Sequence, residues 1–210
     1  MTDKQQIQLA KVLSMVFSPF YVPVWSLIGL FMFSHLKLFP LSYKLFVLIV
    51  VFCFTVLVPL LSIRVFQHTN RLSRWEMSHR RNLHVSYVLT LLSYATCLLL
   101  MYKTHVPLLI RNIVVAALVA QVICTLINLK WKISIHMVGM GGLTGVDFAL
   151  SNLFFFNPLL PGCILILLSG LVGSSRIILR QHSLLQVVAG FAVGFACALL
   201  FTLSTWMSWS

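Results

Sequence analysis

The sequence predicts an all-α, polytopic bundle of transmembrane helices, and three observations lead to that fold class. Hydrophobic residues make up 60% of the 210 residues and charged residues only 9%, whereas soluble domains carry about 25% charged residues. Apolar stretches of roughly 20 residues recur, the length a helix needs to cross a hydrocarbon core of ~30 Å. The period-2 alternation of barrel strands is absent, so helices must satisfy the backbone inside lipid.

Seven apolar stretches are the expected spans, in chain order 12–34, 44–66, 85–101, 106–128, 137–156, 159–174 and 183–209. Asn157-Pro158 and Pro161 interrupt the fifth and sixth, so we expect six to seven spans. The polar N-terminus runs directly into the first stretch without a small-residue cleavage site, which indicates a retained helix. Residues 1–210 are therefore predicted to be a single integral membrane domain.

Three polar segments between these stretches are rich in Arg, Lys and His: 67–84, 129–136 and 175–182. With seven spans, all three lie on the same side of the membrane as the N-terminus. That side holds 11 of the 15 Lys and Arg residues. When the three arginines considered below for chemistry are left out, the count is eight against four, which favours a cytoplasmic site in a bacterial inner membrane. The net charge of +12 fits lipid head groups or a phosphorylated substrate, not nucleic acid.

The third basic segment contains Ser175-Arg176, with His182 six residues after the arginine. Gln186 lies one helical turn beyond His182, so its amide can reach back to the imidazole ring. This pattern is typical of a nucleophilic or acid–base histidine with an arginine that holds an oxyanion. An interfacial histidine beside a snorkelling arginine is the alternative.

The other two segments offer matching chemistry. Ser134 and His136 precede a glycine-rich helix start, where N-terminal amides favour anions and small residues permit close helix packing. Arg74 and Arg81 lie in a short arginine-rich loop, and guanidinium groups bind phosphate oxygens bidentately. A solvated basic loop that fixes orientation is the competing interpretation of that loop.

Together the three segments resemble the signature of the type 2 phosphatidic acid phosphatase superfamily. Its pattern is Lys-x6-Arg-Pro, then Pro-Ser-Gly-His, then Ser-Arg-x5-His-x3-Asp. The third motif matches Ser175, Arg176 and His182 at the family's spacing. The second is reduced to Ile133-Ser134-Ile135-His136, and the first to Arg74-x6-Arg81-Asn82.

The resemblance implies roles for these residues. His182 would attack phosphorus to form a phosphohistidine, and His136 would protonate the leaving alkoxide. Arg74, Arg81, Ser134 and Arg176 would bind the phosphoryl oxygens. No cofactor or metal is implied, because the sequence has no carboxylate cluster. Substrate lipids in the surrounding membrane are the expected partners, and the oligomeric state is left open.

The main departure from the family is Gln186, which occupies the position of an aspartate that orients the nucleophile. An amide accepts a hydrogen bond but lacks the charge. The leading interpretation is a lipid-phosphate phosphatase, and the alternative is a family member with weak or no activity that binds anionic lipid or scaffolds a complex. A transporter is a weaker third option, because no internal repeat is evident. Asp147, the one acid inside a predicted span, is expected to hydrogen-bond Asn152 or a neighbouring span.

Overall fold

The computed structural model describes residues 3–69, 80–155 and 157–207, and it is entirely helical over those residues. This confirms the predicted all-α fold class. Within the described residues, six helical segments are long and apolar enough to cross a membrane. The chain is therefore an integral membrane protein by the length and composition of its helices.

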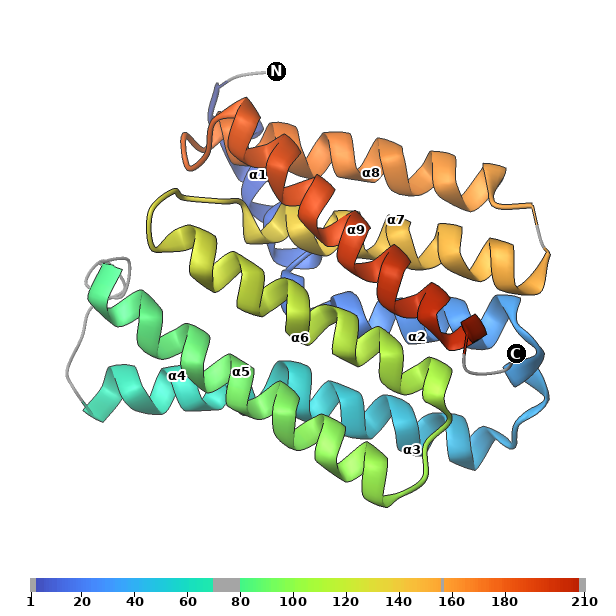
Figure 1. Cartoon of the computed structure of the whole chain (residues 1–210). Helices are drawn as coiled ribbons and strands as arrows, with labels where there is room; N and C mark the ends of the chain where they lie inside the picture. The colour runs from blue at the N-terminus through green and yellow to red at the C-terminus, as the bar shows by residue number, and fades with distance from the viewer. Residues whose placement is uncertain (1–2, 70–79, 156, 208–210) are drawn as a thin grey trace.

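The helices run side by side in a bundle (Figure 1). Helices α3 (Leu41–Phe52), α4 (Val58–Thr69) and α5 (Arg80–Lys103) form one side of it. Helices α7 (Ile135–Phe154), α8 (Leu159–Ile178) and α9 (Leu184–Met207) form the other side. Between them lie α2 (Val22–Phe33) and α6 (Leu108–Asn128). The π-helical turn Cys53–Leu57 joins α3 to α4 into one continuous span, and the Ser93 hydroxyl of α5 donates to the Phe54 carbonyl there.

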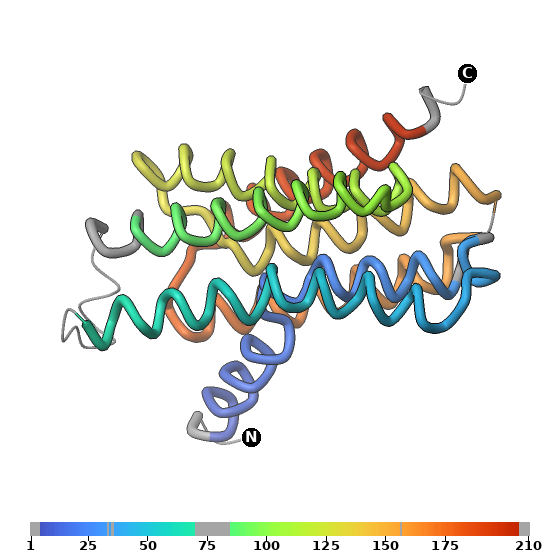
Figure 2. Tube along the Cα trace, turned by 90° about the horizontal axis from the view of Figure 1, so that it is seen from below, coloured from blue at the N-terminus to red at the C-terminus, as the bar shows by residue number. Residues whose placement is uncertain are grey.

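The first predicted span, 12–34, overlaps the candidate membrane span Gln5–Met32, but this segment is not one continuous helix. Helix α1 (Asp3–Val16) ends before a short 3-10 turn, Pro19–Tyr21, and α2 begins after it. Proline has no backbone N–H and is favoured at the first positions of a helix, so Pro19 and Pro23 start new helices and do not continue the old one. As a result α1 runs across the direction of the other helices (Figure 2) and packs mainly on α8.

Helix α7 lies inside the bundle, packed against α2, α8 and α9. Thirteen of its 20 residues are buried. It is not among the six strongly apolar segments, because glycines, Asp147 and Asn152 dilute its hydropathy. Neighbouring helices cover α7, whereas the other helices face lipid. The six apolar segments and α7 together agree with the predicted six to seven spans.

Glycines set the separation of α7 and α9. A methyl group at Gly194 would lie 1.9 Å from the Val138 carbonyl oxygen, and one at Gly141 would lie 2.1 Å from the Phe191 carbonyl oxygen. These distances leave no room for any side chain. Close contact of small residues is how helices associate in lipid, where no hydrophobic force drives one helix against another. The close packing predicted for the glycine-rich helix is confirmed.

The turns that join α6 to α7 and α8 to α9 lie at one end of the bundle, together with the last turn of α4 and the first turn of α5 (Figure 1, left). The described parts of the three basic segments therefore lie at the same end, as the seven-span topology predicts. The C-terminal end of α9 lies at the opposite end. The described parts of all three candidate motifs are thus on one face.

Candidate active site

His182 lies in the turn between α8 and α9, where a tight helix end directs it back over the bundle. The Arg180 N–H donates to the Ile177 carbonyl at 2.9 Å, and the Gln181 N–H donates to the Arg176 carbonyl at 3.1 Å. This pair of bonds is a Schellman motif, with Arg180 in the left-handed conformation at φ 53°. The chain therefore reverses immediately after α8, and His182 follows close to Arg176.

Gln186 fixes the tautomer of His182. Its oxygen Oε1 accepts the Ser183 backbone N–H at 3.1 Å and lies 3.3 Å from Nδ1 of His182. The first bond is half of a capping box, in which the third residue of a helix reaches back to its N-cap. Because a backbone N–H requires the amide oxygen, that oxygen also faces Nδ1, which must carry the proton. The ring also makes a hydrogen bond with the Lys132 backbone, so Gln186 and the loop before α7 both hold it in place. A nucleophilic histidine would use the lone pair of the other ring nitrogen, Nε2.

Ser134 is the N-cap residue of α7, and its side chain is fully buried. Its backbone N–H donates to the Gln186 carbonyl at 3.4 Å, which joins the second and third motifs directly. Its hydroxyl makes no capping bond and has no hydrogen-bond partner among the described residues. A buried hydroxyl without a partner is costly unless a ligand or water completes it.

The segment before Ser134 is held by two further residues. The Asn128 side chain accepts the Ile133 N–H at 3.1 Å, and its amide nitrogen donates to the Tyr87 hydroxyl at 3.4 Å. Tyr87 comes from α5, so the loop between α6 and α7 is fixed to the opposite side of the bundle. Sequence reasoning missed both residues, since polar residues near span ends are common and their spacing gives no motif.

His136 occupies the first turn of α7, and its Nε2 lies 3.1 Å from the Ser14 carbonyl of α1. A carbonyl only accepts hydrogen bonds, so Nε2 carries the hydrogen and Nδ1 is free to exchange a proton with a ligand. Helix α1 therefore contributes a backbone carbonyl to the site, and the sequence of α1 did not indicate this.

Arg176, in the last turn of α8, has a buried Nε without a hydrogen-bond partner among the described residues. It lines a cavity of about 460 Å³ together with His136, His182 and Lys132. The remaining walls come from the 3-10 turn, α4, α5 and α6, and they include the hydroxyl-bearing side chains of Ser18, Ser86, Tyr87, Thr90 and Tyr94. One cavity, lined by Lys132, Arg176 and several hydroxyl groups, therefore contains both histidines.

The electrostatic environment favours a neutral His182. Burial lowers the pKa of its imidazole, and the positive charges of Arg176 and Lys132 lower it further. The hydrogen bonds that the ring makes with the Gln186 side chain and with the Lys132 backbone act in the opposite direction and raise that pKa. The lowering effects are larger, so the imidazole of His182 is neutral at neutral pH.

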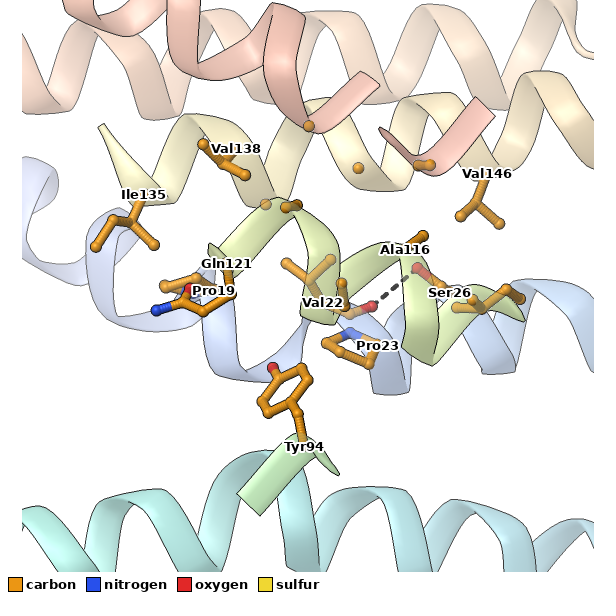
Figure 3. A pocket seen from close by; sticks show the side chains of 17 residues that line it. Pro19, Val22, Pro23, Ser26, Tyr94, Ala116, Gln121, Ile135, Val138 and Val146 are labelled. Atoms are coloured by element: carbon orange, nitrogen blue, oxygen red, sulfur yellow. Dashed lines mark hydrogen bonds between the residues drawn. The ribbon is translucent and has the colours of Figure 1, made fainter. Parts of the chain in front are cut away.

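A second, narrower cavity of about 60 Å³ continues from the first towards the middle of the bundle. The two share Pro19, Tyr94, Gln121 and Ile135 as lining residues. Figure 3 shows Tyr94 pointing into this inner cavity opposite Val22 and Pro23. Apart from Tyr94, Gln121 and Ser26 its walls are apolar or glycine. The combined space is polar at the membrane end and apolar inside.

The structure brings together four of the predicted site residues with Gln186, which orients one of them: Ser134, His136, Arg176 and His182. Arg74 lies outside the described residues. Arg81 falls in the first turn of α5, at the same end of the bundle, but its side chain also lies outside the described part. Within the described residues no group of three or more His, Cys, Asp or Glu side chains is placed to hold a metal ion.

The prediction for Asp147 is wrong. The Asn152 amide donates to the Phe148 carbonyl of its own helix at 2.9 Å. Asp147 Oδ2 has no hydrogen-bond partner among the described residues. Asn152 is therefore satisfied by its own backbone, and Asp147 does not contact the candidate active site either.

No protein-family model, curated protein or solved structure matches the chain.

Proposed function

We propose that this protein is a membrane lipid-phosphate phosphatase that works through a phosphohistidine on His182. One observation carries the proposal. His182, oriented by Gln186, lies in the same cavity as a second histidine and an arginine nitrogen that has no hydrogen-bond partner among the described residues. The Ser134 hydroxyl, which also has no partner there, belongs to the residue between Ile133 and Ile135, and both of these line the cavity. Phosphoryl transfer needs little beyond a positioned nucleophile, an acid and cations around the phosphoryl oxygens.

In the proposed reaction Nε2 of His182 attacks phosphorus, and the bond from phosphorus to the lipid oxygen breaks. His136 gives its Nδ1 proton to the leaving oxygen. Burial and the positive charge of Arg176 lower the pKa of His136 in the free protein, so the step requires the bound phosphate dianion to raise that pKa before the proton is transferred. Arg176 and Ser134 donate hydrogen bonds to the phosphoryl oxygens, beside the free N–H groups at the start of α7. Water then loses a proton to His136 and displaces the phosphate, which restores His182.

The cavity supports a substrate with a long apolar tail. Its polar part lies at the end of the bundle, and the inner part is apolar and points along the bundle (Figure 3). A lipid phosphate has this distribution of polarity. Phosphatidic acid, phosphatidylglycerol phosphate, a polyprenyl pyrophosphate and a lipid A phosphate are the substrates to compare.

The test is phosphate release from these four lipids by the purified protein, with His182→Ala as the matched variant. Wild type should release phosphate from one of them, and brief reaction with labelled lipid should leave acid-labile phosphate on the protein. His182→Ala should do neither while it keeps its thermal stability. Equal inactivity of the two proteins on all four lipids would refute the phosphatase.

A non-catalytic lipid-binding protein is the second candidate, and the neutral Gln186 in the place of an acid favours it. Such a protein would use the same cavity to hold an anionic lipid without turnover. Binding of phosphatidic acid vesicles that survives the double change His136→Ala and His182→Ala, with no phosphate released by wild type, would select this candidate.

We place the protein in a bacterial inner membrane, with the site at the end rich in Lys and Arg. The charge count favours the cytoplasmic side for that end, whereas bacterial proteins of the resembled superfamily often act on the outer face. Cysteines introduced at Ser78 and Lys103, labelled from each side, distinguish the two orientations, because Ser78 precedes α5 in the sequence and Lys103 is the last residue of α5.

A further inference from the structure

A separate apolar groove of about 500 Å³ lies on the other side of α7, between α2, α8 and the end of α1. Trp25 and Ile164 in its walls are about half exposed, which places the groove against the lipid. It shares no lining residue with the cavity that holds His136 and His182. It therefore needs its own explanation.

Asp147 is the one acidic or basic residue in the lining of this groove. Its side chain is 9% exposed, and Oδ2 has no hydrogen-bond partner among the described residues. Oδ2 faces α8 at Gly162, where an added methyl group would lie 3.6 Å away. An unsatisfied carboxyl group inside hydrocarbon is costly, and such residues are retained where they bind something.

The surroundings of Asp147 indicate what kind of molecule supplies its missing hydrogen bond. Leu143 lies one turn before Asp147 on α7 and Leu150 one turn after, and both line the groove. Asp147 is also about 18 Å along the helix from Ile135 and about 10 Å from Phe154. The complementary ligand is therefore hydrocarbon on both sides of a single hydrogen-bonding group. A polar head group would be poorly solvated at this depth.

We propose that this groove binds a lipid acyl chain that carries a hydroxyl group within the chain, with Asp147 as the hydrogen-bond partner of that hydroxyl. The protonated carboxyl group can both donate to the hydroxyl and accept from it. The apolar walls contact the chain on either side. This site uses none of the proposed catalytic or phosphate-binding residues, although Ser26 and Val146 line both the groove and the inner cavity. The two proposals are therefore tested by different variants.

The test compares two stearoyl methyl esters that differ only in one mid-chain hydroxyl. Trp25 lines the groove, so a brominated acyl ester that enters it should quench its fluorescence, and Trp25→Phe removes that part of the signal. Displacement of the brominated ester by each stearoyl ester then gives the two affinities. Wild type should bind the hydroxylated ester about fivefold more tightly, the ratio that one ordinary hydrogen bond provides.

Asp147→Leu should bind both esters equally, whereas Asn152→Leu, on the same helix, should keep the wild-type ratio. Gly29→Leu provides a second variant that leaves the carboxyl group intact. Gly29 also lines the groove, and no heavy atom lies within 4 Å of the position that an added methyl group would take. A leucine there should therefore occupy the space and weaken binding of both esters.

Equal affinities in wild type, or an unchanged ratio in Asp147→Leu, would overturn the proposal. Loss of quenching in wild type as the protein dimerises in detergent would also overturn it, because a second copy of the chain would then cover the groove.

Discussion

The Nδ1 atom of His182 lies 3.3 Å from Oε1 of Gln186, the same oxygen that accepts the Ser183 N–H. The Gln186 amide can therefore orient the His182 ring as a carboxylate would, but it carries no negative charge. In a serine-protease triad an Asp-to-amide change costs about 10⁴ in rate because it selects the wrong tautomer. Here the backbone N–H holds the amide the right way round, so only the missing charge should limit the rate.

Gln186→Glu should accordingly raise kcat about tenfold on the lipid that wild type hydrolyses. It keeps the side-chain length and adds a negative charge beside the imidazolium that forms during attack. Gln186→Asp should gain less, because it is one methylene shorter and cannot reach both Ser183 and His182. Gln186→Leu, which removes the acceptor, should lose about 100-fold. A fall in kcat with Gln186→Glu would show that the cavity is adapted to the amide.

Activity should persist as the pH falls through 6.5, the ordinary pKa of a histidine. The proposed reaction needs neutral His182. Burial and the positive charges of Arg176 and Lys132 lower the pKa of His182, so its protonation and the loss of rate should occur only at more acidic pH. Lys132→Met removes one positive charge and should raise the pKa of His182, which moves the acidic limb of the pH–rate profile to higher pH. A limb unmoved by this change, or one already above 6.5 in wild type, would contradict the electrostatic account.

Helix packing should depend on the glycines between α7 and α9. Gly194→Ala and Gly141→Ala each place a methyl group against backbone of the facing helix, so each should destabilise the fold by about 1–3 kcal/mol. Both should also lower activity, because α7 carries His136 and the turn before α9 carries His182. Gly170→Ala is the control, since no heavy atom lies within 4 Å of the added group. Thermal unfolding in detergent measures the difference.

Much of this fold follows from the sequence because lipid imposes strong limits on it. Apolar length and the parity of basic loops are enough to predict the spans and the common end at which Ser134, Arg176 and His182 meet. The reach of Gln186 to His182 also follows, since i and i+4 residues share a helix face. These features depend on neighbouring residues or on the order of the spans, so one sequence is enough to predict them.

Other features arise only from three-dimensional packing. The break between α1 and α2 is visible as Pro19 and Pro23, but hydropathy averages across it. The sharp turn after α8 is hidden because Arg180 adopts a left-handed conformation that glycine or asparagine usually takes. The contribution of Ser14 to the site is a backbone carbonyl, and no residue type marks a carbonyl in advance.

A phosphate analogue should stabilise the protein through Arg176 and Ser134. Both have a buried polar atom without a hydrogen-bond partner among the described residues, and an oxyanion in the cavity would complete them. Orthovanadate should raise the unfolding temperature of wild type. Arg176→Lys should bind vanadate at least tenfold more weakly, because an ammonium lacks the fork of a guanidinium. Arg180→Lys, in the adjacent turn, is the control that should keep wild-type affinity. Equal affinity of Arg176→Lys and wild type would remove Arg176 from the oxyanion site.

Displacing α1 should impair the site without unfolding the bundle, because the Ser14 carbonyl holds Nε2 of His136 at 3.1 Å. Ala10, one turn before Ser14 on the same face of α1, is only 2% exposed, whereas Leu9 beside it is 52% exposed. Ala10→Phe should therefore push α1 away from α8, its main packing partner. A misplacement of about 1 Å in a catalytic group can cost 10²-fold in rate, so kcat should fall at least tenfold.

Leu9→Phe adds similar bulk on the exposed face and should leave kcat unchanged. Because the basic limb of the pH–rate profile reports the acid, the loss in Ala10→Phe should come with a shift of that limb, which a general loss of folded protein would not produce. An unchanged limb together with unchanged kcat in Ala10→Phe would mean that the carbonyl of Ser14 does not position His136.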